Sequence, residues 1–343
     1  MGFLSIKEQK HYLIQTDKFE FDFDDNKIIG FNLKFDLHWA IREGLTFDKA
    51  PLWDCQYAHF LLTNQKNKFP SLDDVAKHYG LSTKLDVVRL NYWEKGIDTP
   101  DVPREIMTEY LTQDLNVTYQ VYLKQIEDFK KRPKLYTLFQ LGMRDQRVLL
   151  EMEYNGLLWD EEVSEKKKVE VEEVVQGIEE KLKKYHGSIP INYDSPDQLS
   201  ALIYGGTVVD QYRVPNGTYK SGAKAGQIKF AWKEQEYQLE RLVEPLKKTA
   251  LKKEGLWATN EKVLRRIKHP IASLILERSK QTKLHEYCVK MPKLISEMDW
   301  PEGVLHGTFN QCAAATGRLS STDPNLQNFD SRILQAIRSR YND

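Results

Sequence analysis

A change of pattern near Pro133 constrains the fold of this chain more than any other feature. Before it, the apolar stretch 27–31 predicts a short buried strand, and the apolar residues from Leu33 to Gly44 keep helical spacing. After it, almost every periodic stretch is helical. We therefore expect an α/β fold first and a mainly α-helical fold after it, with a domain boundary near 130–135.

Spacing and capping residues predict the other elements. Ser71 before an acidic run predicts a capped helix start, and Ser195-Pro196 predicts another. The segment 205–232, rich in glycine, lysine and tyrosine, predicts a loop or a flexible hairpin. Heptad-like spacing between Lys134 and Gly156 predicts an amphipathic helix, with apolar residues Leu138, Leu141, Val148, Leu149 and Met152. Further helices are predicted at 53–64, 104–128, 161–185, 233–253, 259–267 and 271–298.

The composition excludes several classes of protein. The 343 residues, 41% of them hydrophobic, are typical of a water-soluble chain with two or three domains. There is no apolar run of about eighteen residues that could cross a membrane, and no signal-peptide pattern at the start. The three cysteines, Cys55, Cys288 and Cys312, are too scattered for a disulfide framework or a zinc site, so we expect buried thiols. A cytoplasmic protein without a membrane partner is expected.

The net charge of zero hides an uneven distribution. Residues 1–210 carry 27 Lys and Arg against 36 Asp and Glu, residues 211–293 carry 19 against 8, and residues 294–343 carry 4 against 6. The balances are therefore −9, +11 and −2. A block as basic as 211–293 suits a polyanion, because each neutralised phosphate releases condensed counterions. A solvated, lysine-rich helical surface explains the same balance, and charge alone does not separate the two.

Three residues of the first part suggest a hydrolytic metal site. Asp36 lies where a predicted strand passes into a helix, and Tyr110 and Asp114 lie four residues apart on one predicted helix face. Phosphodiester hydrolysis by two Mg²⁺ ions needs hard oxygen ligands and ions about 3.5–4 Å apart, and a tyrosine can orient the attacking water. Singly, however, an Asp at a strand end is typical of a helix cap, and a Tyr/Asp pair is typical of a helix surface.

Taken together, these segments resemble the second and third motifs of the 3′–5′ exonuclease domain in family A DNA polymerases, the DNA polymerase I family. The resemblance lies in 31–38, in 52–55 and in 110–114. It implies a ribonuclease H-like α/β domain. It further implies that Asp36, Tyr110 and Asp114 are catalytic and that Asp36 and Asp114 bind Mg²⁺.

The first motif of that domain, Asp-x-Glu on the opening strand, is not found before Asn32. The acidic run 20–25 has the wrong order and lies too near the second motif. Because the first motif supplies two further metal ligands, the resemblance implies an incomplete exonuclease domain. We therefore predict weak or no exonuclease activity from this chain alone.

Three later segments, 144–156, 192–205 and 259–284, resemble the polymerase domain of the same family. The resemblance makes the basic block a thumb, which holds duplex DNA through phosphate contacts without reading its sequence. It therefore favours phosphate binding over a solvated surface. The lysines expected to bind DNA are Lys247, Lys248, Lys252, Lys253 and Lys283.

The most specific resemblance is Thr316–Asn328, preceded by His306–Gln311. By pattern alone, its glycine, serines and proline indicate a polar turn. The resemblance implies that Arg318 reaches into the minor groove at the primer terminus, where correct base pairs present similar acceptors. It also implies that Asn325, Gln327 and Asn328 contact the primer–template.

The resemblance implies four parts: a partial 3′–5′ exonuclease domain at 1–132, connecting helices at 133–204, a basic thumb at 205–293 and the N-terminal part of an α+β palm at 294–343. The palm aspartates and the fingers of the family are not found in these residues. We therefore expect a component or fragment of a DNA-directed DNA polymerase, a nucleotidyltransferase, that is inactive alone. A second polypeptide carrying the rest of the palm and the fingers is one expected partner.

Three functions remain open from the sequence. The chain is a polymerase component that binds primer–template DNA in replication or repair, a non-catalytic DNA clamp, or a 3′–5′ exonuclease with an added thumb. Primer extension with the missing part separates the first two, and metal-dependent hydrolysis identifies the third.

Overall fold

The computed structural model describes residues 2–13, 26–83, 87–222 and 224–341. The acidic run 20–25 therefore lies outside the described residues. Two compact units form: unit 1 comprises Met1–Leu158, Val304–Phe329 and Ser339–Asp343, and unit 2 comprises Trp159–Gly303 and Asp330–Arg338. Within the described ranges, no helix is both long and apolar enough to cross a membrane.

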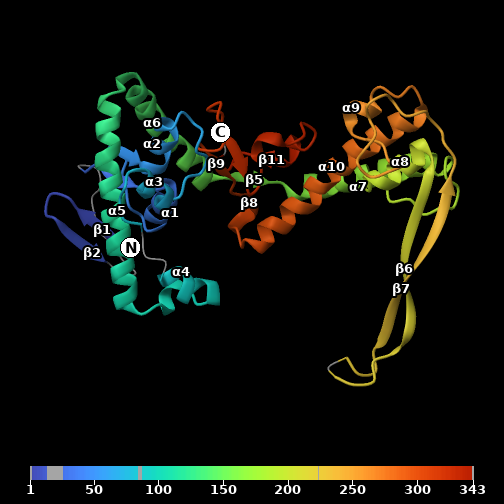
Figure 1. Cartoon of the computed structure of the whole chain (residues 1–343), viewed down its shortest axis with the longest axis horizontal. Helices are drawn as coiled ribbons and strands as arrows, with labels where there is room; N and C mark the ends of the chain where they lie inside the picture. The colour runs from blue at the N-terminus through green and yellow to red at the C-terminus, as the bar shows by residue number, and fades with distance from the viewer. Residues whose placement is uncertain (1, 14–25, 84–86, 223, 342–343) are drawn as a thin grey trace. The chain divides into compact units, whose positions relative to one another are not determined.

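Unit 1 is mixed α/β (Figure 1). Its strands are β1 (Gly2–Ser5), β2 (Lys10–Leu13), β3 (Ile28–Gly30), β4 (Leu52–Asp54), β5 (Leu157–Trp159, which ends at the unit boundary), β8 (Val304–Leu305), β9 (Thr308–Asn310) and β10 (Ser320–Thr322). Its helices are α1 (Leu33–Arg42), α2 (Cys55–Leu62), α3 (Leu72–His78), α4 (Val87–Asn91), α5 (Arg104–Lys130) and α6 (Pro133–Asn155). The parallel strands β3 and β4 are joined through α1, so the predicted α/β character is confirmed.

The core of unit 1 lies between this strand pair and the helices α1, α2, α5 and α6. Trp53 of β4 is 2% exposed, and its ring contacts the rings of Tyr122, Phe129 and Phe139. Its indole N–H donates to the side chain of Gln125 at 3.1 Å, which in turn donates to the Cys55 carbonyl at 2.8 Å. The polar groups of Trp53 and Gln125 are thus paired within the core.

Most helix starts of unit 1 follow the predictions. Ser71 and Asp74 form a reciprocal capping box at the start of α3. The helix predicted from residue 53 is wrong at its start, because 52–54 forms β4 and α2 begins only at Cys55. Asp54 explains the difference, since its carboxylate accepts from the backbone N–H groups of Gln56 and Tyr57 and so caps the helix.

Helix α6 is confirmed, but its buried face differs from the apolar stripe in the sequence. Of the apolar residues expected to define it, Leu149 is buried, whereas Leu138, Leu141, Val148 and Met152 are 45–56% exposed. The residues that face the interior of unit 1 are Phe139, Gly142, Met143, Gln146, Leu149, Leu150 and Glu153. Two of these are polar and are buried because they bind groups of other elements.

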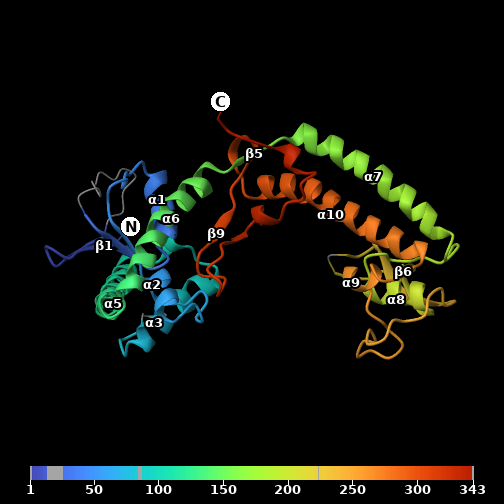
Figure 2. The same ribbon diagram turned by 90° about the horizontal axis from the view of Figure 1, so that it is seen from above.

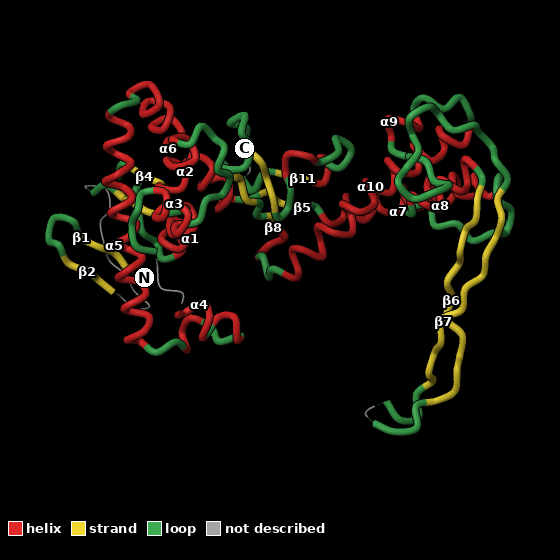
Figure 3. The backbone as a smooth tube through the Cα atoms, in the orientation of Figure 1, coloured by secondary structure: helices red, strands yellow, loops and turns green. Residues whose placement is uncertain are grey.

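Unit 2 is mainly helical and carries one long β-ribbon (Figure 3). The long helices α7 (Glu161–Lys183) and α10 (Pro270–Glu297) pack side by side (Figure 2), and both were predicted. The remaining elements are α8 (Pro196–Tyr204), β6 (Gly206–Thr218), β7 (Ile228–Leu239), α9 (Glu261–Leu264) and β11 (Ile337–Arg338). A core at one end of the long helices joins Leu182, Ile203 and Ile271.

The helix predicted at 233–253 is wrong. Residues 228–239 form β7, which pairs antiparallel with β6, and the residues after it up to α9 contain no helix. The strand forms because Phe230 and Trp232, two positions apart, favour extended structure, and β6 offers a partner strand with β-branched residues. The helix predicted at 259–267 shortens to the single turn of α9, capped by Asn260.

Arg278 fixes α10 against the other helices of unit 2. Its guanidinium donates to Glu179 at 2.8 Å and to both carboxylate oxygens of Asp194 at 2.8 and 3.3 Å, and it lies over the ring of Tyr193. Asp194 directly precedes the cap of α8, so one buried side chain sets the positions of α7, α8 and α10.

Candidate functional sites

Asp36 and Asp114 influence each other electrostatically in unit 1. Asp36 lies on α1 at the protein surface, and Asp114 is half-buried on α5. The atoms packed around the Asp36 carboxylate remove part of its water, and the negative charges of Asp54 and Asp114 add to this, so that the pKa of Asp36 rises to about 6. The two predicted residues are thus near enough for the charge of Asp114 to act on Asp36.

Tyr110 occupies a different environment. Its side chain is buried in a small cluster with Val88 and Val102, and its ring meets the Trp93 ring edge-on at 5.7 Å. The ring thus holds the N-terminal part of α5 against α4. The catalytic role of Tyr110 stays a prediction.

Asp54 joins the starts of two helices. It is 3% exposed and accepts from the backbone N–H groups of Asn32 and Leu33, at the start of α1, at 3.1 and 3.0 Å, as well as from the start of α2. The side-chain amide of Gln146 donates to it at 2.8 Å. Burial raises the pKa of Asp54, while these donors act against that rise. Both carboxylate oxygens of Asp54 therefore accept hydrogen bonds that stabilise the fold.

Mg²⁺ binding was predicted at Asp36 and Asp114. Two neighbouring carboxylates suit a cation, but a two-metal site needs further ligands. Among the described residues, no group of three or more His, Cys, Asp or Glu side chains is arranged to hold a metal ion. The described residues therefore do not fit a two-metal site by themselves, and we assign no hydrolytic step to them.

The predicted DNA-contacting motif lies on a hairpin of β9 and β10. Phe309 of β9 pairs with Ser321 of β10 in antiparallel register. The buried Ser321 hydroxyl donates to the Pro324 carbonyl and accepts from the Leu326 N–H, both at 3.2 Å, and so closes the turn after β10. Gly307 packs against this turn, since an added Cβ would lie 2.6 Å from a methyl carbon of Leu326. These contacts give the motif one defined path.

Glu153 of α6 anchors this hairpin to the rest of unit 1. Its carboxylate is 6% exposed, accepts from the Phe309 N–H at 2.5 Å and from the His38 ring at 2.8 Å, and pairs with the Lys34 ammonium. Lys34 also donates to the Phe309 carbonyl at 2.5 Å. Burial raises the pKa of Glu153, but the donors from His38, Lys34 and Phe309 outweigh it, so the pKa is lowered overall.

Gly156, three residues later, completes the anchor. Its φ of +64° favours glycine, and an added Cβ would lie 2.6 Å from the Leu305 carbonyl oxygen of β8. The pair β5 and β8 follows directly, with Leu157 opposite Leu305. Glu153 and Gly156 lie in the segment 144–156 that resembles the polymerase domain, but the sequence gave no partner for the acid or the glycine.

The polar residues of the motif remain at the surface. Arg318, Asn325, Gln327 and Asn328 are all exposed. Asn325 also caps the short 3₁₀ turn Leu326–Asn328, because its side chain accepts from the Gln327 N–H at 3.1 Å. The anchored hairpin thus exposes an arginine and several side-chain amides. These groups suit hydrogen bonding to the edges of nucleobases and to sugars.

The predicted lysines lie in two places in unit 2. Lys247, Lys248, Lys252 and Lys253 are exposed in the irregular segment between β7 and α9, and Lys283 is exposed on α10. Lys253 pairs with Asp197 at 2.6 Å, which offsets its charge. Their contacts with DNA stay predictions.

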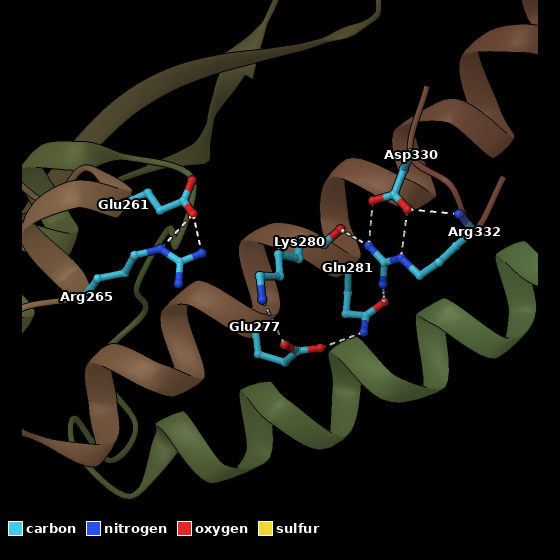
Figure 4. Close-up of polar contacts among 7 residues, drawn as sticks. All are labelled: Glu261, Arg265, Glu277, Lys280, Gln281, Asp330 and Arg332. Carbon is cyan, nitrogen blue, oxygen red and sulfur yellow. Dashed lines mark hydrogen bonds and ion pairs between the residues drawn. The ribbon is translucent and has the colours of Figure 1, made fainter. Parts of the chain in front are cut away.

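Two groups of polar contacts lie on or beside α9 and α10 of unit 2, one between Glu261 and Arg265 and one that joins α10 to 330–332 (Figure 4). Arg332 donates to Asp330 at 2.9 Å, to the Gln281 side chain at 3.0 Å and to the Lys280 carbonyl at 3.2 Å. The bonds from Arg332, with a smaller contribution from Lys283, lower the pKa of Asp330 to about 2. Lys283 itself has no acid within ion-pair distance in the described part of the chain.

Residues 234–341 match the family model of DNA polymerase family A, and residues 10–127 match that of a 3′–5′ exonuclease. The thermostable DNA polymerase I of Thermus thermophilus is 30% identical over 296 residues, which are 85% of this chain and 27% of that protein. The chain belongs to DNA polymerase family A. The resemblance inferred from the sequence is thus confirmed, as is the order of an exonuclease segment followed by a polymerase segment.

Other family A relatives have similar coverage. DNA polymerase I of Borreliella burgdorferi is 26% identical over 93% of this chain and 30% of its own length, and the DNA polymerase of Bacillus phage SP01 is 22% identical over 93% and 36%. The chain therefore spans about a third or less of these relatives. The solved POL domain of Pol1 from M. smegmatis, in complex with DNA primer-template and dNTP, has a TM-score of 0.62 at 20% identity, over 90% of this chain and 45% of that one.

Proposed function

We propose that this family A chain contributes primer–template binding to template-directed DNA synthesis in replication or repair. The observation that carries the proposal is the β9–β10 hairpin. Glu153 anchors it through the Phe309 N–H, and the hairpin exposes the Arg318 side chain to solvent. An arginine can donate two hydrogen bonds from a planar group to minor-groove acceptors. The relative from M. smegmatis, which shares the fold, is described in complex with DNA primer-template.

We also propose a division of the chain into four parts. It assigns a ribonuclease H-like exonuclease domain to 1–132, connecting helices to 133–204, a thumb to 205–293 and the first part of the palm to 294–343. The exposed lysines Lys247, Lys248, Lys252 and Lys283 then support duplex phosphates, and the protein acts in the cytoplasm where its DNA lies.

Nucleotide addition by family A enzymes depends on divalent metals held by carboxylates. We assign those carboxylates, with the Mg²⁺ ions, to residues other than these 343, either on the same polypeptide or on a second one. The contribution of this chain is therefore to position the primer terminus.

Binding to a labelled primer–template with a recessed 3′ end tests the proposal. Replacement of Arg318 by alanine should weaken binding by about 1–3 kcal/mol, since it removes contacts to base edges. Arg104→Ala is the matched control, because Arg104 is an exposed arginine of the same unit outside the motif. Equal affinity of the two variants would refute the role of Arg318.

Primer extension separates a polymerase component from a passive clamp. The chain is mixed with a polypeptide that carries the catalytic carboxylates of the same enzyme, and extension is compared with either part alone. Extension only in the mixture supports the component, and its loss in Arg318→Ala assigns the contact. Binding without extension in the mixture favours the clamp.

A further inference from the structure

The β6–β7 ribbon extends well beyond its base on α8. Figures 1 and 3 show the two strands running away from the helices of unit 2, with no other element of that unit beside their far part. We call residues 211–233 the distal ribbon. It lies outside both segments matched by the family models, which cover 10–127 and 234–341. An isolated two-stranded ribbon gains little stability by itself, so stability alone does not account for a ribbon of this length, and we look for a function for it.

The strand register places two aromatic rings on one face of the distal ribbon. Trp232 lies opposite Arg213, and Phe230 lies opposite Pro215. Because residues two apart on a strand point to the same side, the rings of Phe230 and Trp232 lie on one face, about 7 Å apart along β7. Trp232 is 62% exposed and Phe230 is 50% exposed, so both rings are open to solvent.

The distal ribbon is also strongly basic. It carries five cations, Arg213, Lys220, Lys224, Lys229 and Lys233, and no acidic residue. Within the described ranges, none of the five has an acid at ion-pair distance. The Arg213 guanidinium lies 4.8 Å from the Trp232 ring centre, which steadies the ring and places a positive charge beside it. The complement of this surface is therefore an anion that also has flat apolar faces.

We propose that the distal ribbon binds single-stranded DNA, with bases stacked on Trp232 and Phe230 and phosphates paired with the surrounding cations. A single strand fits better than a duplex because the base faces of a duplex already cover one another, whereas unpaired bases are free to stack on aromatic side chains. Two rings in a row along one strand suit successive bases of a single strand, which stack on aromatic side chains. The five cations make a purely apolar partner a poorer match. This site uses residues other than those of the proposed primer–template contact of Arg318.

Fluorescence anisotropy of the full chain with a labelled oligo-deoxythymidine of about 12 nucleotides tests the inference. The double variant Phe230→Ala/Trp232→Ala should bind at least about tenfold more weakly, since removal of each stacking ring reduces affinity severalfold or more. Tyr212→Ala is the matched control: Tyr212 is an exposed aromatic of the same ribbon, but its register places it on the opposite face. Trp232→Phe keeps a ring and should retain most of the affinity.

The charge contribution has its own measurement. Lys229 and Lys233 alternate with Phe230 and Trp232 along β7 and lie on the other face, so the lysines of the connection between β6 and β7 are tested instead. Lys220→Gln/Lys224→Gln should reduce the slope of log affinity against log salt by about one for each phosphate that the variant no longer neutralises. A blunt duplex of the same length should compete poorly. Unchanged affinity in the double aromatic variant, or equal competition by the duplex, would overturn the proposal. A change in oligomeric state of that variant, with affinity for the oligonucleotide unchanged, would instead assign the face to self-association and would also overturn it.

The outcome is independent of the proposed function. The loss of affinity for the recessed primer–template that Arg318→Ala causes is expected to be the same in the ribbon variants as in the wild type, even though the ribbon also binds its single-stranded overhang. If single-stranded binding fails while that contact stands, only the ribbon inference is wrong.

Discussion

Replacement of Glu153 by glutamine should destabilise unit 1, because Glu153 is the buried acceptor that holds the β9–β10 hairpin. The carboxylate accepts from Lys34, His38 and the Phe309 N–H, and it is 6% exposed while the Lys34 side chain is 12% exposed. A hydrogen bond to a charged group contributes about 1.5–3 kcal/mol, and loss of one partner of a buried ion pair costs about 3–5 kcal/mol. Glutamine keeps one acceptor oxygen, so we expect the lower end, about 3 kcal/mol.

Urea unfolding followed by hydrogen exchange and mass spectrometry measures this effect locally. Peptides from 304–312 and from α1 should lose protection at lower urea in Glu153→Gln, because both elements contact the carboxylate. Glu151→Gln is the matched control, since Glu151 is exposed on the same helix two residues away. A difference below about 0.5 kcal/mol between the two variants, which is the usual range for surface changes, would refute the role of Glu153 as an anchor.

The pH dependence has a definite sign. The pKa of Glu153 is lower in the folded protein than its ordinary value of 4.5. Its contribution to stability is therefore complete above that value and is lost as the pH falls through the folded pKa. The difference between the wild type and Glu153→Gln should accordingly shrink below about pH 4.5.

Three further predictions concern other buried contacts. Gly156→Ala should destabilise unit 1 by about 1–3 kcal/mol in urea unfolding, because of its positive φ and the close Leu305 carbonyl, whereas Gly177→Ala, with open space around it on α7, should stabilise by about 0.5–1 kcal/mol. Arg278→Lys should lower the urea midpoint of unit 2, since lysine cannot bind Glu179 and both oxygens of Asp194 together; an unchanged midpoint would contradict this. His59 is 1% exposed, and its burial, with a smaller effect of the nearby His78, lowers its pKa from 6.5 to about 4. The free energy of unfolding should therefore fall by about 2 kcal/mol between pH 7 and pH 5, which thermal melts can measure. His59→Phe should remove most of this pH dependence.

Much of the candidate site followed from local patterns. Strings such as Thr316–Asn328 could be matched from the sequence because a tight turn needs glycine, proline and hydroxyl residues at fixed positions. Cys55, Cys288 and Cys312 are buried free thiols, as expected from cysteines too widely spaced for a disulfide framework or a zinc site. The helices starting at Leu72 and Pro196 were predictable because their caps act within three or four residues.

The partners of the buried charges could not be predicted in this way. Glu153 meets Phe309 across 156 positions of sequence, and Arg278 meets Asp194 across 84. The exposed apolar face of α6 is a second example. Gln146 and Glu153 are buried because they form hydrogen bonds to other elements of unit 1, not because they are hydrophobic. Local periodicity measures only the apolar contribution to burial, so polar anchors escape it.

The sequence by itself determined the family, the uneven charge and the path of the motif around Arg318, because each depends on residues close together in the chain. Only the tertiary structure decided that the strand runs on through 233–239, where a helix was predicted, since pairing with β6 overrides the local helical preference. Only the tertiary structure placed Arg213 beside Trp232 and Lys34 beside Glu153. Those pairings depend on strand register and helix packing, which bring distant residues into contact.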